Sequence, residues 1–195
     1  MNRIKEKKFI KTIKQKGITI DSSYPDSAEV SFKNDLELSR FWKIPEGARR
    51  IPYFVDTILG ALDPWESAYV WKHLGSWVSR VKSERLNDDL QAVIYRGVGI
   101  ADDNADILEF KRNELHVLIA LIFNQLVFGW HVEDDLYIIP NHGKQIIKTD
   151  HHDVVHVLFR DDSTMKQFIE EMSKNGFELP NDLPDETLKK PDWMK

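Results

Sequence analysis

Cysteine is missing from all 195 residues of the chain. Its absence excludes disulfide bonds, thiolate metal ligands and a cysteine nucleophile within this sequence. Residues 1–17 are rich in lysine, but neither a continuous apolar segment nor a small-residue cleavage site follows them, so they do not resemble a secretory signal. We therefore expect a protein of a reducing compartment, the cytoplasm.

A long uninterrupted hydrophobic run is also missing. The longest apolar region, residues 115–130, is interrupted by His116, Asn124 and Gln125. It is shorter than the roughly 20 residues that a helix needs to span a bilayer. This region is predicted to form a core helix, and we expect no membrane partner.

The familiar nucleotide and calcium motifs are incomplete. Gly97-Val98-Gly99 lacks the third glycine of a dinucleotide-binding loop. Asp102, Asn104 and Asp106 match three ligand positions of a calcium loop, but Ile107 stands where that loop needs a glycine. No Walker sequence, Gly-x-Ser-x-Gly turn or His-Glu-x-x-His pair occurs. The sequence therefore contains no motif that defines an enzyme class.

Positive charge is concentrated at the N-terminus. Residues 1–16 hold seven lysine and arginine side chains, with Glu6 as their only acid, which gives a local net charge of +6. The remaining residues hold 20 basic and 31 acidic side chains, which leaves them a net charge of −11. A body of this charge repels phosphate backbones, so we expect no nucleic-acid partner and favour a basic protein partner.

The chain is predicted to have three parts: a basic N-terminal arm over residues 1–16, a single α+β domain over residues 17–180, and an extended tail rich in proline and acidic residues over residues 181–195. The apolar residues of the arm fit a short amphipathic helix that ends at Gly17. Two interpretations of the arm stay open: a frayed and solvated end, or a segment that binds an acidic surface, either of its own body or of a partner.

We predict an α+β fold in which a mostly helical N-terminal half packs with a C-terminal three-stranded antiparallel meander, followed by a covering helix. One or two short strands are expected between residues 17 and 34. The predicted helices cover residues 52–62, 64–81, 86–97, 104–128 and 161–176. The predicted meander strands cover residues 136–139, 145–148 and 154–159.

The strongest helix signal lies at residues 63–66. Asp63-Pro64-Trp65-Glu66 combines an N-cap acid, a first-turn proline and an acid three residues after the cap, as in a capping box. The apolar residues that follow share one helical face: Val70, Trp71, Leu74, Trp77, Val78 and Val81. We predict that a helix begins at Pro64 and continues through Gly75, with a break at Gly75 as the alternative.

Histidines are concentrated in the last third, where five of the seven lie between His131 and His156. The candidate metal ligands are His151, His152, Asp153 and His156, a set of imidazoles and a carboxylate that suits Zn²⁺ or another divalent ion. On a strand, successive side chains point to opposite faces, so these four converge only if residues 150–153 form a turn. Two other interpretations stay open: acid–base catalysis by the histidines, and a structural turn that they merely cap.

Two functions from different classes follow. The first is a non-enzymatic protein-binding module whose acidic surface meets a basic partner, with Trp42, Trp65 and Trp193 as exposed aromatic anchors. An immunity or inhibitor protein that masks a basic toxin has this character, although no motif connects the chain to such a family. The second is a metal-assisted or His-dependent hydrolase with its site at the meander turns, where His142 joins the four candidate ligands. We expect no cofactor, with a divalent metal ion as the alternative.

Overall fold

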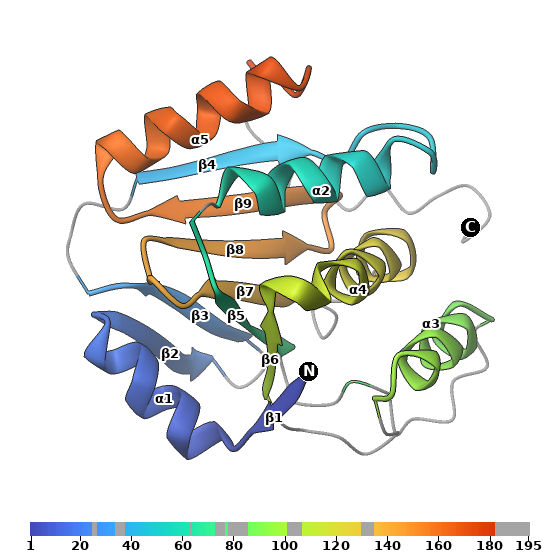
Figure 1. The fold of residues 1–195 in the computed structure, drawn as a ribbon, viewed down its shortest axis with the longest axis horizontal. Coiled ribbons are helices and arrows are strands. Elements are labelled where there is room, and N and C mark those ends of the chain that lie inside the picture. Colours follow the sequence, from blue (N-terminus) through green and yellow to red (C-terminus); the bar gives the residue numbers. More distant parts are fainter. Residues whose placement is uncertain are drawn as a thin grey trace.

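The computed structural model of the chain describes residues 1–24, 27–33, 38–62, 64–72, 77, 86–100, 107–129 and 135–181. Within these residues the main element is a seven-stranded antiparallel sheet in the order β1-β6-β5-β7-β8-β9-β4 (Figure 1). Its strands are β1 (Asn2–Ile4), β6 (Ile107–Lys111), β5 (Ser67–Lys72), β7 (Leu136–Pro140), β8 (Gln145–Asp150), β9 (Val154–Phe159) and β4 (Leu38–Lys43). A separate two-stranded sheet pairs β2 (Ile18–Tyr24) with β3 (Ser27–Phe32).

Helices cover the large sheet. They are α1 (Glu6–Gln15), α2 (Ile51–Ala61), α3 (Leu86–Gly97), α4 (Leu115–Phe128) and α5 (Asp162–Lys174). Figure 1 shows α2 and α4 lying across the sheet, α5 along its β4 edge, and α1 beside the β2–β3 pair. The predicted helices over residues 52–62, 86–97 and 161–176 are confirmed as α2, α3 and α5.

The central strands are buried on both faces. In β7, Ile138 belongs to the hydrophobic cluster that contains side chains of α2, α4 and α5, whereas Tyr137 and Ile139 belong to the cluster that contains α1, β2 and β3. Ile147 and Ile146 of β8 divide between the two clusters in the same way. Because strand side chains alternate, a strand covered on both faces is a continuous apolar run in the sequence.

The predicted fold class is wrong, because the N-terminal half is not mostly helical. β1, β4, β5 and β6 precede residue 112 and join the meander strands in one sheet, through the β5–β7 and β4–β9 pairings. β7, β8 and β9 lie in their predicted ranges and pair antiparallel, but they form the middle and one side of that larger sheet. Each of these four strands is short and pairs only with residues far along the chain, so local patterns understate it.

The helix predicted from Pro64 is also wrong, because β5 occupies Ser67–Lys72. Val70 is buried in one cluster and Trp71 in the other, which is the two-residue alternation of a strand. β5 lies between β6 and β7, so main-chain hydrogen bonds form on both of its sides. Of the rest of the predicted helix, residues 73–76 and 78–81 lie outside the described residues.

The helix predicted over residues 104–128 begins later than expected. Its first part is strand β6, in which Ile107 and Leu108 are buried in opposite clusters. A short 3-10 turn over Arg112–Glu114 then leads into α4. The polar residues Lys111-Arg112-Asn113-Glu114 therefore mark the end of the strand and the start of the core helix.

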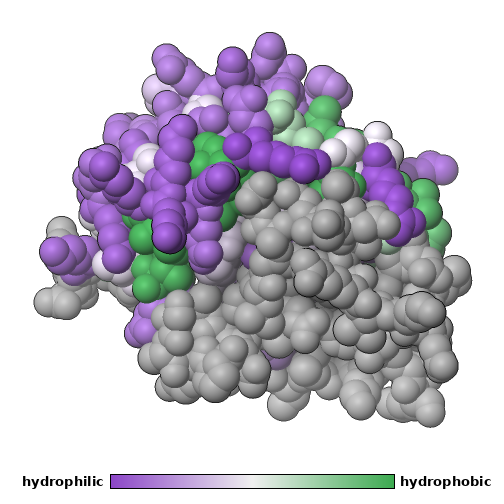
Figure 2. All heavy atoms as spheres, turned by 90° about the horizontal axis from the view of Figure 1, so that it is seen from below, coloured by the Kyte–Doolittle hydropathy of each residue, from purple (hydrophilic) through white to green (hydrophobic). Residues whose placement is uncertain are grey.

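Residues 1–16 form part of the folded structure. β1 pairs with β6, and Phe9 and Ile13 of α1 are fully buried, with the Phe9 ring 5.7 Å from Tyr69 and 6.3 Å from Trp71 between ring centroids. The amphipathic-helix interpretation of this segment is therefore confirmed, and the frayed-end interpretation is wrong. Hydrophilic side chains gather on the face of the molecule where α1 and β1 lie (Figure 2).

Two predicted features cannot be placed. The segment from Asp102 to Asp106, which partly matches a calcium loop, and the predicted tail beyond residue 181 lie outside the described residues. Among the helices that the structure describes, none has the length and apolar character needed to cross a bilayer.

Candidate functional site

A three-residue turn between β8 and β9 builds the site. Asp150, the last residue of β8, pairs with Val154, the first of β9, so residues 151–153 form the connection. Asp153 adopts a φ of 62°, the left-handed conformation typical of the last residue in such a hairpin loop. Oδ1 of Asp150 accepts a hydrogen bond from the His152 backbone N–H at 2.9 Å, which closes the turn. The turn therefore forms for local reasons and places two histidines side by side.

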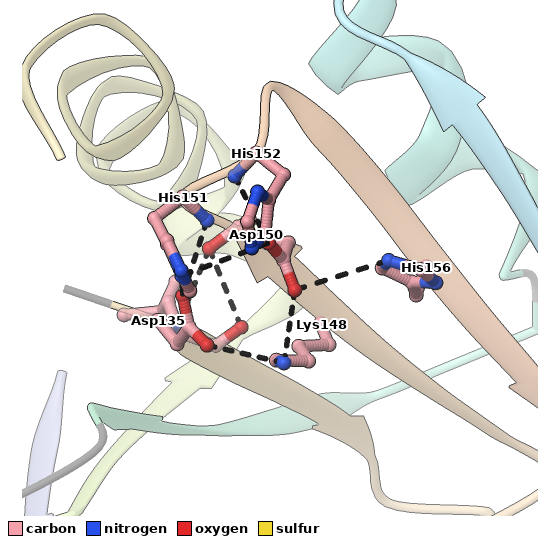
Figure 3. A network of polar contacts seen from close by, with 8 residues as sticks. Asp135, Lys148, Asp150, His151, His152 and His156 are labelled. Carbon is pink, nitrogen blue, oxygen red and sulfur yellow. Dashed lines mark hydrogen bonds and ion pairs between the residues drawn. The ribbon is translucent and has the colours of Figure 1, made fainter. Parts of the chain in front are cut away.

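A buried carboxylate orients one of these histidines. Asp135, which directly precedes β7, has 3% of its side chain exposed. Its Oδ1 accepts the His151 backbone N–H at 3.2 Å and lies 3.0 Å from Nδ1 of the same residue (Figure 3). Because a carboxylate only accepts hydrogen bonds, Nδ1 is the donor. The pairing of Leu136 with Thr149 brings Asp135 level with the end of β8.

Lys148 connects the two carboxylates. Its Nζ lies 3.1 Å from Oδ2 of Asp135 and 2.9 Å from Oδ2 of Asp150. Burial alone would lower the pKa of Lys148, but Asp135, Tyr137 and Asp150 together raise it above its ordinary value. Burial would raise the pKa of Asp150, but Lys148 and the His152 N–H lower it. Asp150 is therefore held as a carboxylate.

Three imidazoles surround Asp150 (Figure 3). Oδ1 lies 3.6 Å from Nδ1 of His151 and 3.9 Å from Nε2 of His152, and Oδ2 lies 3.9 Å from Nε2 of His156. The rings of His151 and His152 have centroids 4.2 Å apart. Nδ1 of His152 is buried and has no hydrogen-bond partner. Burial is the main cause that lowers the pKa of His156, which favours its neutral form.

The site adjoins a pocket. His152 and Asp153 line an open pocket of about 510 Å³, together with residues from the end of β4, the start of α2 and the end of α4. Most of the remaining lining is apolar, including Ile51 and Leu126. The Ile44 N–H donates to the Asp153 carbonyl at 2.9 Å and fixes the turn against one wall. One imidazole of the cluster is thus in contact with a cavity.

The predicted metal ligands converge only in part. His151, His152 and Asp150 offer ligand atoms that all lie within 4.8 Å of one another. Asp153 is not part of this group, and Asp150 takes its place, because Asp150 turns toward the imidazoles at the end of β8. His156 lies on the far side of Asp150 in Figure 3.

Asp135 and Lys148 were missed by sequence reasoning. Asp135 is 16 residues from His151, and only the antiparallel register of β7 and β8 brings them together. Lys148 could have been found, because it shares a strand face with Asp150 at a spacing of two.

The other predicted site residues lie elsewhere. Trp42 and Trp65 are 1% and 4% exposed, so the expectation that they are surface anchors is wrong for both. Their indole N–H groups donate to the carbonyls of Phe177 at 3.2 Å and Leu59 at 3.0 Å, which satisfies each buried indole. Trp193 lies outside the described residues.

His142 lies in the β7–β8 turn, at the opposite end of β8 from His151 and His152. It does not join the cluster.

Compared with protein families, curated proteins and solved structures, the chain shows no match.

Proposed function

We propose that the protein binds a divalent transition-metal ion at Asp150, His151 and His152 and uses it as a metal-assisted hydrolase. The observation that carries the proposal is the convergence of these three side chains, with ligand atoms within 4.8 Å of one another, in one hairpin turn. Two imidazoles and a carboxylate form a donor set that zinc and neighbouring transition metals favour.

The surroundings of the three residues support this proposal. Ligand histidines in metal sites commonly donate their other ring N–H to a carboxylate, and Asp135 stands in that relation to His151. With Nδ1 of His151 donating to Asp135, its Nε2 is the nitrogen left for a metal ion. Lys148 contacts Oδ2 of Asp150, and Oδ1 lies 3.9 Å from Nε2 of His152. Two ligands of a tetrahedral zinc ion lie about 3.3 Å apart for metal–nitrogen bonds of about 2.0–2.1 Å. The distance from Oδ1 of Asp150 to Nε2 of His152, 3.9 Å, is close to that value.

Hydrolysis is the chemistry that such a site favours. Three protein ligands leave a coordination position for water, and a bound divalent ion lowers the pKa of that water toward neutrality. His152 belongs both to the ligand group and to the lining of the 510 Å³ pocket, so a substrate in the pocket would lie next to the ion.

Two neighbouring aspartates provide the test. Dialysed full-length protein is titrated with Zn²⁺ and with Mn²⁺ by calorimetry, and bound metal is then measured by elemental analysis. We expect one ion per chain for the natural protein and for Asp153→Asn, and loss of binding for Asp150→Asn. The same metal-loaded proteins are assayed against chromogenic esters and phosphoesters. Failure of the natural protein to retain stoichiometric metal, or equal losses in the two variants, would refute the site.

A second candidate function, the protein-binding module for a basic partner, is supported by the net charge of −11 outside residues 1–16. Its aromatic anchor would be Tyr53 of α2, which is 49% exposed, instead of the buried Trp42 and Trp65. The test is affinity capture at moderate salt with the natural protein and with Tyr53→Ala as baits. A basic protein that binds the first bait and not the second supports this function, and capture of none counts against it.

A further inference from the structure

The exposed face of α1 is the most basic surface that one described element presents. Four lysines of the helix are exposed: Lys7, Lys8, Lys11 and Lys14. Lys5, the residue just before the helix, is exposed as well. We call these five side chains the α1 lysine face. In the part of the chain that the structure describes, they form no ion pair, and Glu6 is the only acid of the helix.

Packing fixes the direction of this face. Phe9 and Ile13 are completely buried, and Phe9 contacts the rings of Tyr69 and Trp71 of β5. The apolar side of α1 is therefore buried in the core, and its lysines are exposed on the opposite side of the helix. Because the apolar side is not available, α1 cannot insert into a bilayer in the way that an interfacial amphipathic helix does.

Helix stability does not explain the lysines. Lys7 and Lys11, four residues apart, form a like-charge pair that destabilises a helix. Lys7 and Lys8 lie in the first turn, where the helix dipole disfavours positive charge. Lys14, in the last turn, is favoured by the dipole, but Lys7, Lys8 and Lys11 do not stabilise the helix. The exposed positive charge of the face suits an anionic partner.

We propose that the α1 lysine face is a docking surface for an acidic segment of a partner protein. A nucleic acid is longer than the helix, and its backbone would meet the rest of a chain that carries a net charge of −11. The five residues of the face are all lysine, so it has neither the guanidinium forks that hold phosphates in pairs nor aromatic rings for stacking bases. A short acidic peptide needs only point charges and fits the length of α1.

Two matched triple variants test the proposal. The first variant replaces three lysines of the face by glutamine: Lys7, Lys11 and Lys14. The second replaces three exposed lysines outside the face by glutamine: Lys33, Lys111 and Lys166. The net charge therefore changes equally in both. Binding of a short labelled peptide that alternates glutamate and serine is measured by fluorescence anisotropy at low salt. We expect the first variant to bind about tenfold more weakly, the sum of three exposed ion pairs, and the second to match the natural protein.

Stability and competing ligands complete the experiment. The melting temperature of the first variant should equal or exceed that of the natural protein, because like-charge repulsion is removed, so weaker binding cannot be ascribed to unfolding. Equal losses in both variants would show that net charge alone acts and would overturn the proposal. Tighter binding of an oligothymidylate, or of phosphatidylserine vesicles, through the same three lysines would overturn the choice of an acidic polypeptide.

Discussion

Two hairpin turns at opposite ends of β8 contain histidines whose hydrogen-bond partners differ. In the β7–β8 turn, Nε2 of His142 lies 3.0 Å from the Leu62 carbonyl, and Nδ1 accepts the Lys144 backbone N–H at 3.0 Å. Both ring nitrogens are therefore bound to the backbone. In the β8–β9 turn, the neighbours of His151 are carboxylates, and Nδ1 of His152 has no hydrogen-bond partner.

The difference distinguishes a histidine with a structural role from one whose ring can bind a metal ion or transfer a proton. A ring whose two nitrogens are bound to main-chain groups has no nitrogen left for a metal ion or a proton in transit. His142 fits that description, and it stabilises the turn in which it lies. His151 and His152 lie next to the Asp150 carboxylate, and Nδ1 of His152 has no hydrogen-bond partner. The neighbours of each imidazole decide its role.

The largest expected effect is a difference in metal affinity between variants of the two turns. His152→Ala removes a proposed ligand and should weaken Zn²⁺ binding by at least about 100-fold, whereas His142→Ala should leave it unchanged. Both affinities are measured by competition with a chromophoric chelator. If the two variants lose affinity equally, the distinction between the turns does not hold.

Removal of the buried carboxylate should have the next largest effect. Asp135→Ala leaves the His151 N–H groups unpaired and takes one of two carboxylates from Lys148, so we expect a loss of about 2–3 kcal/mol in the free energy of unfolding. Asp153→Asn, at an exposed position that tolerates a left-handed residue, is the control and should change little. Urea denaturation measures both. A loss below about 0.5 kcal/mol for Asp135→Ala would mean that the contact is not structural.

The two histidine variants should rank in the opposite order for stability: His142→Ala should destabilise the fold more than His152→Ala, although it leaves metal binding unchanged. His142→Ala deletes two hydrogen bonds to the backbone, one half-buried and one exposed, and should cost about 1 kcal/mol. His152→Ala deletes a ring that has a nitrogen without a partner and should cost less. The two variants are compared by urea denaturation without metal. A greater cost for His152→Ala would reverse the assignment of the structural turn.

Much of the fold could be predicted where a segment contains its own signals. α5 has an N-cap, Asp161, whose side chain accepts the Thr164 N–H at 2.8 Å, and its apolar residues repeat with the helical period. β5 shows the contrary case. The residues of β5 fit both a helix and a strand. Pairing with β6 and β7 stabilises the strand, and the paired residues lie about 40 and 70 positions away in the sequence. A local pattern carries no information about such distant partners.

The site could be predicted to the same extent. The sequence Asp150-His151-His152-Asp153 identified the turn, because Asp residues close hairpins through their own side chains. It did not identify which aspartate faces the imidazoles, since that depends on the register in which β8 ends. Asp135 could not be found at all, because only the β7–β8 pairing brings it to His151.

The smallest expected effect is a change in pH dependence at the structural turn. Burial is the main cause that lowers the pKa of His142 below its ordinary value of 6.5. The bond to the Leu62 carbonyl raises this pKa, but Lys144 and Lys16 lower it, and the net shift is downward. Protonation would also break the bond from the Lys144 N–H to Nδ1. As pH falls through 6.5, the unfolded chain takes up a proton that the folded chain refuses, so the free energy of unfolding decreases.

Glutamine at this position removes the titration and retains an amide in the turn. His142→Gln should therefore lose less stability than the natural protein between about pH 7 and pH 5. Part of the slope should remain, because burial also lowers the pKa of His156, which titrates in both proteins. Urea denaturation at several pH values measures the difference between the two slopes. Identical slopes would mean that His142 accepts its proton as readily in the folded chain as in the unfolded one, and the contrast between a closed and an open histidine turn would then have no energetic basis.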